Sequence, residues 1–102
     1  MQLSEQEKKA LKQELVECLR SETEVQRIIV FGSFLQSDTP HDLDVAVFQD
    51  SSEAYLPLAL KYRRKTRSVA RQIPLDIVPL KMESHSDPFL AEVEHGEVIY
   101  ER

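Results

Sequence analysis

The spacing of hydrophobic residues predicts that the chain begins with a helix. Leu11 and Leu15 recur at helical spacing, and Ser4 followed by Glu7 forms a capping box in front of them. We therefore expect an amphipathic helix over residues 5–20.

Short, mainly apolar segments rich in β-branched residues predict the strands. A run that is apolar at nearly every position is typical of a strand buried on both faces, rather than of one that is half exposed. The predicted strands cover residues 27–31, 42–48, 73–79 and 98–100.

Two more helices are predicted between these strands. Pro57 fits the first turn of a helix that runs to about Arg71, because the missing proline N–H does no harm there. Ser86 can cap a short helix, and Gly96 is well placed to end it as a C-cap.

The order of these elements predicts an α/β (α+β) fold. If a helical turn follows Ser33, the order is α-β-α-β-α-β-α-β, which indicates a small mixed β-sheet with helices packed against it. A length of 102 residues fits one domain, residues 1–102. The polar N-terminus is unlike a signal peptide, no apolar run approaches the roughly 20 residues that span a bilayer, and Cys18 has no partner for a disulfide. We therefore expect a cytoplasmic protein with no membrane partner.

Gly32 and Ser33 lie where a buried strand ends and a polar turn begins. Glycine at such a position lets a ligand approach the backbone closely. If a helical turn starts at Ser33, its free N–H groups suit a phosphate. An ordinary turn is the alternative interpretation of this pair alone.

Three aspartates in two of the predicted strands are the candidate metal ligands. Asp42 and Asp44 are two residues apart, so on a strand they share one face, where two carboxylates repel each other unless a cation binds them. Asp76 is a lone acid in another short apolar strand. If the strands are neighbours, the three acids can hold two Mg²⁺ ions, and Asp76 can accept a proton from an incoming hydroxyl. Strand-end aspartates that face water are the simpler alternative.

Gly32-Ser33, then Asp42-Leu43-Asp44, then Asp76 resemble the signature of the DNA polymerase β-type nucleotidyltransferase superfamily. The length is similar to that of its minimal members, the MNT antitoxins of HEPN–MNT toxin–antitoxin pairs. The resemblance implies a polymerase β-like fold with ATP as substrate and Mg²⁺ as cofactor.

The resemblance also implies a role for each residue. Gly32 and Ser33 would contact the β- and γ-phosphates, Asp42 and Asp44 would ligate both metal ions, and Asp76 would ligate the catalytic ion and help to activate the acceptor. AMP would pass to a hydroxyl, a tyrosine of a HEPN-family toxin partner in similar systems.

Two departures from the family pattern favour a second hypothesis. Only eight residues separate Ser33 from Asp42, and Leu35 stands where the family often has an arginine. The alternative is a catalytically weak or inactive binding module that neutralises its partner by complex formation.

The charge of the chain bears on its partners. A net charge of −5 argues against non-specific nucleic-acid binding, so direct binding of that kind is not expected. The run Lys61–Arg71 is strongly basic, and two interpretations remain open. It is either a solvated helix face or a cationic surface for the triphosphate or an acidic partner. The three tyrosines, Tyr55, Tyr62 and Tyr100, are expected to pack rather than to react.

Overall fold

The computed structural model describes residues 2–81, 91 and 93–102. The elements up to residue 81 follow the predicted order, except that two helices replace the one predicted from Pro57. No helix in these ranges is long and apolar enough to cross a membrane. The helices are α1 (Glu5–Leu19), α2 (Ser33–Gln36), α3 (Tyr55–Lys65) and α4 (Arg67–Ala70). The strands are β1 (Val25–Phe31), β2 (Leu43–Gln49), β3 (Leu75–Lys81) and β4 (Glu97–Glu101).

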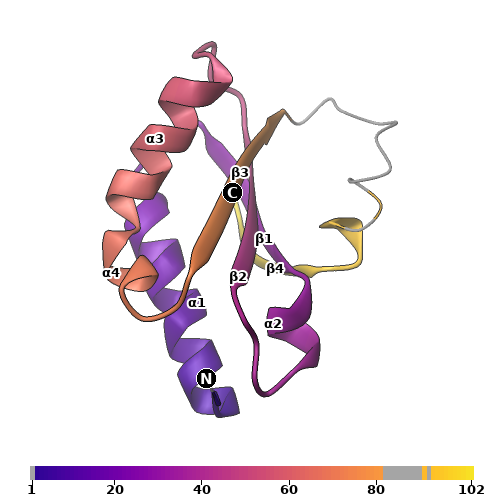
Figure 1. Cartoon of the computed structure of the whole chain (residues 1–102). Coiled ribbons are helices and arrows are strands. Elements are labelled where there is room, and N and C mark those ends of the chain that lie inside the picture. Colours follow the sequence, from indigo (N-terminus) through magenta and orange to yellow (C-terminus); the bar gives the residue numbers. More distant parts are fainter. Residues whose placement is uncertain (1, 82–90, 92) are drawn as a thin grey trace.

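The four strands form one mixed sheet in the order β3-β2-β1-β4 (Figure 1). β1 pairs antiparallel with both β2 and β4, whereas β2 and β3 run parallel. The prediction of a small mixed sheet with packed helices is therefore confirmed. β3 is an edge strand, so Pro79 within it removes no hydrogen bond from the sheet interior.

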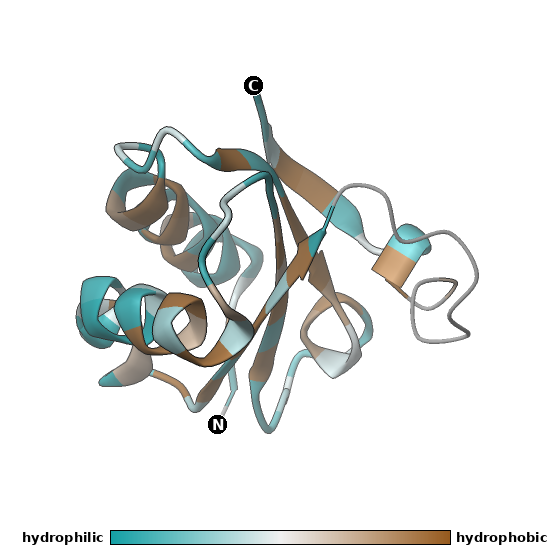
Figure 2. Ribbon diagram, turned by 90° about the horizontal axis from the view of Figure 1, so that it is seen from above, coloured by the Kyte–Doolittle hydropathy of each residue, from teal (hydrophilic) through white to brown (hydrophobic). Residues whose placement is uncertain are grey.

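Alternate residues of the strands face two different layers. Helices α1, α3 and α4 cover one face, and Figure 1 shows them together on one side of the sheet. A smaller apolar cluster covers part of the other face and includes Phe31, Ala46, Phe48 and Val93. Both faces of β1 and β2 are therefore buried, as the apolar runs predicted, and Figure 2 shows the hydrophobic residues of the central strands.

The start of α1 follows the sequence pattern closely. The Ser4 hydroxyl accepts from the Glu7 N–H at 3.1 Å, and the Ser4 N–H donates to the Glu7 carboxylate at 2.9 Å. The capping box is thus formed in full.

The predicted helix from Pro57 to Arg71 is wrong in one respect, because the chain forms two helices there. Pro57 does lie in the first turn, but the helix breaks at Thr66, whose hydroxyl donates to the Tyr62 carbonyl at 2.7 Å. The Thr66 N–H still donates to the same carbonyl at 3.1 Å, and the break lies in the Thr66 backbone, whose φ of −109° and ψ of 20° are not helical.

Gly96 also has a different role from the predicted one. It follows helical residues 93 and 94, but its backbone is not in the left-handed region that a glycine C-cap uses. A Cβ at Gly96 would instead collide with the backbone carbonyl of Val30. Close packing against β1 requires glycine here. Ser86 lies outside the described residues.

Candidate functional site

Asp44 and Asp76 occupy directly adjacent positions on parallel strands. In the register of β2 and β3, Asp44 is the partner of Asp76 and Leu43 is the partner of Leu75. Registered neighbours point to the same face, so both carboxylates lie on the face opposite α1, α3 and α4. The prediction that their two strands are neighbours is confirmed.

Asp42 lies one residue before β2 and two residues before Asp44, next to the pair of acids. The Leu43 N–H donates to the Pro74 carbonyl at 2.9 Å, which holds the starts of the two strands together. Asp42 and Asp44 are half-buried, and Asp76 is exposed on the edge strand. Within the described ranges, no three His, Cys, Asp or Glu side chains are gathered closely enough to hold one ion. The backbone brings these positions together, but the three carboxylates do not form a complete set of metal ligands.

Gly32 lies directly over the Asp44 carboxylate. Its φ of 81° and ψ of −156° belong to a region that is essentially restricted to glycine. A Cβ added at Gly32 would lie 2.5 Å from Asp44 Oδ2. Two independent constraints therefore require glycine here, and both keep backbone close to the carboxylate.

The short helix α2 follows Gly32 and begins at Ser33. The Ser37 N–H donates to the Ser33 carbonyl at 2.9 Å, so residues 33–37 form a closed turn. Gly32 and Ser33 thus lie at the carboxyl end of β1, beside the start of β2. The structure brings together all five residues that the sequence singled out, in the same corner of the sheet.

Lys8 is a residue near this corner that the sequence reasoning missed. Its side chain is only 6% exposed, and its Nζ donates to the Ser37 carbonyl at 2.6 Å and lies 5.4 Å from the centre of the Phe34 ring. Lys8 therefore ties α1 to both ends of α2. A signal was present in the sequence, because Lys8 falls on the apolar stripe of the first helix, three residues before Leu11.

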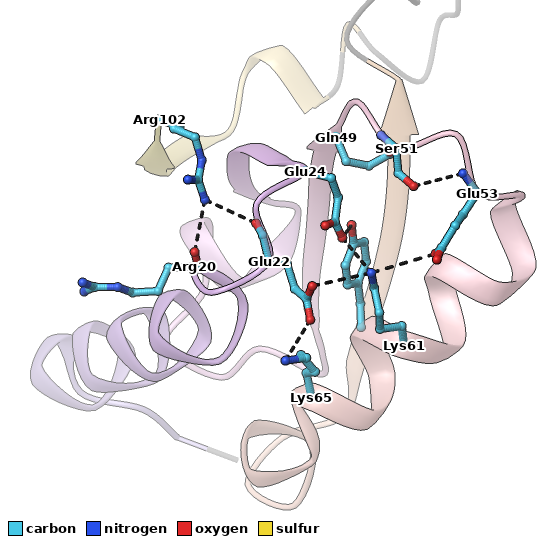
Figure 3. A network of polar contacts seen from close by, with 10 residues as sticks. Arg20, Glu22, Glu24, Gln49, Ser51, Glu53, Lys61, Lys65 and Arg102 are labelled. Carbon is cyan, nitrogen blue, oxygen red and sulfur yellow. Dashed lines mark hydrogen bonds and ion pairs between the residues drawn. The ribbon is translucent and has the colours of Figure 1, made fainter.

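The basic run Lys61–Arg71 divides into two groups. Lys61 contacts Glu24 at 2.9 Å, Glu22 at 3.6 Å and Glu53 at 3.9 Å, and Lys65 contacts Glu22 at 2.8 Å (Figure 3). The two lysines thus form ion pairs with carboxylates of the loops before β1 and before α3. The remaining basic residues are exposed and make no ion pair with any described residue: Arg63, Arg64, Arg67 and Arg71.

The same network contains a buried tyrosine. The Tyr62 hydroxyl donates to Glu24 at 2.9 Å, and burial together with this bond raises the pKa of Tyr62 well above its usual value. Tyr62 therefore packs as predicted. The expectation for Tyr55 was wrong, because its side chain is 56% exposed at the start of α3.

A surface groove lies elsewhere on the molecule. It runs between α1 and β4 and is lined by charged side chains such as Lys9, Lys12 and Glu97. Because β4 and β3 are opposite edges of the sheet, this groove does not include the acids.

The fold and this corner define a class of protein: a small mixed sheet in which a glycine-serine turn faces aspartates on two adjacent strands. Residues 13–102 match the family described as polymerase beta, nucleotidyltransferase. The chain belongs to this family. The comparison with curated proteins found no match.

Solved structures of HEPN–MNT toxin–antitoxin complexes contain chains with the same fold. One is the tri-AMPylated Shewanella oneidensis HEPN toxin in complex with MNT antitoxin, at 18% identity and a TM-score of 0.62, covering 93% of this chain and 73% of that one. A toxin–antitoxin structure with AMP-PNP matches at 22% identity and a TM-score of 0.68, covering 89% and 73%. The MntA–HepT complex matches at 17% identity and a TM-score of 0.61, covering 92% and 73%. At these identities the likeness concerns the fold.

Proposed function

We propose that this protein is a Mg²⁺-dependent nucleotidyltransferase that transfers AMP from ATP to a tyrosine hydroxyl of a HEPN-family partner. The observation that carries the proposal is the adjacency of Asp44 and Asp76, with Gly32 directly above Asp44. Related chains were crystallised with AMP-PNP and with an AMPylated HEPN toxin, which favours ATP as substrate and a HEPN protein as acceptor.

Each residue has a defined task in this proposal. The Gly32 backbone and the Ser33 hydroxyl contact the β- and γ-phosphates, since only a residue without a side chain leaves room beside Asp44. Asp42, Asp44 and Asp76 supply the carboxylate oxygens that Mg²⁺ prefers. Two ions bound there would stabilise charge on the attacking and leaving oxygens.

Asp76 is the acid best placed to receive a proton from the acceptor. It is exposed on the edge strand β3, so a hydroxyl from another protein can reach it from solvent. The hydroxyl oxygen then attacks the α-phosphorus, its proton passes to the carboxylate, and pyrophosphate leaves. A positioned general base contributes roughly 10²–10⁴-fold to such a step.

The test is label transfer from ATP to the HEPN-family protein of the same genome. Label on the α-phosphate should pass to the partner, and label on the γ-phosphate should not. We expect Asp44→Asn and Asp76→Asn to lower the rate by about 100-fold or more. Asp38→Asn is the matched control, because Asp38 is an exposed loop aspartate. Equal labelling by wild type and Asp44→Asn would remove the enzyme assignment.

A second candidate function rests on specific observations. The Ser33–Asp42 connection is short, Leu35 replaces an arginine, and the described carboxylates form no preassembled group of three. A binding module with a weak or vestigial metal site accounts for these features. Neutralisation of the partner by the Asp42→Asn, Asp44→Asn double variant, without label transfer, would favour this function over catalysis.

A further inference from the structure

The outward surface of α3 and α4 carries an exposed stripe of apolar and arginine residues. Their inward positions are buried against the sheet and α1. Within α3 the exposed residues recur every three or four positions, so they lie along one side of that helix, and exposed arginines follow in α4 beyond the break at Thr66. This α3–α4 stripe consists of Leu56, Leu60, Arg63, Arg64, Arg67 and Arg71.

The arginines of the stripe differ from the lysines beside them. Lys61 and Lys65 are held by Glu22, Glu24 and Glu53, and Figure 3 shows Lys61 pointing into this carboxylate cluster. The four arginines have no such partners in the described part of the chain. The lysines of the basic run thus form its ion pairs within the protein, and the arginines remain available to another molecule.

Apolar side chains continue the stripe toward the start of α3. Leu56 is 61% exposed and Leu60 is 42% exposed, and the neighbouring Tyr55 is also exposed. Large apolar residues beside arginine are the composition of protein–protein interfaces, where tyrosine and arginine are enriched and lysine is depleted. The stripe therefore has the composition of an interface rather than that of an ordinary solvated face.

The charge distribution indicates the chemistry of the partner. No acidic residue occurs between Glu53 and Asp76, although the chain has 18 acidic residues and a net charge of −5. A positive surface on a negative molecule selects an acidic partner and orients it. An RNA partner is disfavoured by the net charge and by the absence of aromatics among the arginines. A membrane is disfavoured because the large exposed apolar side chains of α3, Tyr55, Leu56 and Leu60, lie in its first half and form no apolar face along the whole segment.

The stripe also leads toward the proposed site. α3 packs against β3, the edge strand that carries Asp76 on its other face. Arg71 is the C-cap of α4 and lies five residues before Asp76, and the loop between them leads into β3 at Leu75 (Figure 1). A protein docked along the stripe can therefore reach around the exposed edge to the aspartates.

We propose that the α3–α4 stripe is the docking surface for the acceptor protein, which presents an acidic surface with an apolar centre. This inference rests on the proposed function, because it assigns the surface by which the acceptor is held. Docking would act on the affinity for the partner and leave nucleotide binding at the aspartates unchanged.

The experiment compares two charge-reversal variants of the full chain. Arg64→Glu, Arg67→Glu changes the stripe, and Lys9→Glu, Arg20→Glu makes the same charge change at exposed positions of α1 and its C-cap. Binding of the HEPN-family protein of the same genome is measured by calorimetry at low and high salt. Mg²⁺–ATP binding is measured separately for each variant, and circular dichroism checks the fold.

We expect the stripe variant to bind the partner at least about tenfold more weakly, because acidic groups then face glutamates. The α1 control should stay within about twofold, and wild-type affinity should fall with salt because exposed charges are screened. All variants should bind Mg²⁺–ATP alike.

Three outcomes would overturn the docking assignment. The first is wild-type affinity in the stripe variant, which would leave the proposed reaction intact. The second is that wild type binds a 20-nucleotide RNA or phosphatidylglycerol vesicles more tightly than the partner protein, and that the stripe variant loses this binding. The third is no partner binding by wild type, which also removes the acceptor from the proposed function. Mg²⁺–ATP binding still tests the aspartate site in that case.

Discussion

At the scale of single residues, the site depends on one glycine. Gly32 combines a backbone conformation that other residues avoid with close packing against the Asp44 carboxylate. Asp44 is in turn the strand partner of Asp76, so these three residues are central to the proposed chemistry. A side chain at Gly32 would occupy the space beside Asp44 that the proposed phosphate contact requires.

We expect Gly32→Ala to lower the free energy of unfolding by about 1–3 kcal/mol, because alanine is strained at this φ and ψ. It should also abolish Mg²⁺-dependent ATP binding, because the new methyl group collides with the Asp44 carboxylate. Urea unfolding and calorimetry measure the two effects. Ser52→Ala, at an exposed loop position, is the control and should change stability by less than about 0.5 kcal/mol and leave ATP binding unchanged. A Gly32→Ala protein that is stable and binds ATP would contradict this account of the site.

At the scale of elements, α1 positions the turn that follows Gly32. The first helix and its preceding segment contact this region twice, through Lys8 to the Ser37 carbonyl and through the Leu3 N–H to the Asp38 carbonyl at 2.8 Å. The α2 turn is too short to be stable by itself, since isolated helices of a few residues do not form in water. Tertiary contacts from α1 therefore keep Ser33 in place.

Lys8→Met should loosen α2 while keeping the buried stem of the side chain. The Ser37 carbonyl loses a charged donor, so we expect the local opening free energy at the Ser37 N–H to fall by about 1–3 kcal/mol. Native-state hydrogen exchange reports this amide directly, because it is bonded to the Ser33 carbonyl. Lys9→Met, at the exposed neighbouring position, should leave its exchange unchanged. Equal exchange in both variants would show that Lys8 does not hold α2.

At the scale of the whole molecule, a cluster of charges joins α3 to the loop before β1. Glu22 and Glu24 from that loop face Lys61 and Lys65, as Figure 3 shows. Glu24 also accepts a hydrogen bond from the Tyr62 hydroxyl. Burial alone would raise the pKa of the Glu24 carboxyl. Hydrogen bonds from Lys61, from its own backbone and from Tyr62 outweigh burial and hold that pKa below its ordinary value of 4.5.

The lowered pKa of Glu24 predicts how stability depends on pH. The glutamate of the unfolded chain has the higher pKa and takes up a proton first, so protonation favours the unfolded chain. The ionised Glu24 therefore stabilises the folded protein above about pH 4.5, and this stabilisation is lost as the pH falls further. We expect the free energy of unfolding of wild type to fall more steeply below pH 4.5 than that of Glu24→Gln. Denaturant unfolding between pH 3 and 7 measures this, with the exposed Glu94→Gln as control. Parallel curves for wild type and Glu24→Gln would exclude the role of Glu24.

Much of the fold and of the candidate site followed from local patterns. The capping box, the doubly buried strands and the Gly32-Ser33 turn are properties of short segments, so residue spacing was enough to predict them. The break at Thr66 was missed, because it lies in the backbone angles of one residue, which the hydrophobic period does not reveal. The role of Gly96 was missed as well, because it depends on the backbone of β1, which is distant in sequence.

The sequence by itself determined which segments become helices or strands and which of them carry acids, since hydrophobic period and turn chemistry act over a few residues. Only the tertiary structure decided that Asp44 and Asp76 are partners in a parallel pair, and that the lysines of α3 form ion pairs while its arginines form none with the residues that the structure describes. Strand order, register and ion pairing depend on how buried faces pack across the molecule, and one residue of slip would turn every side chain of a strand to the other face.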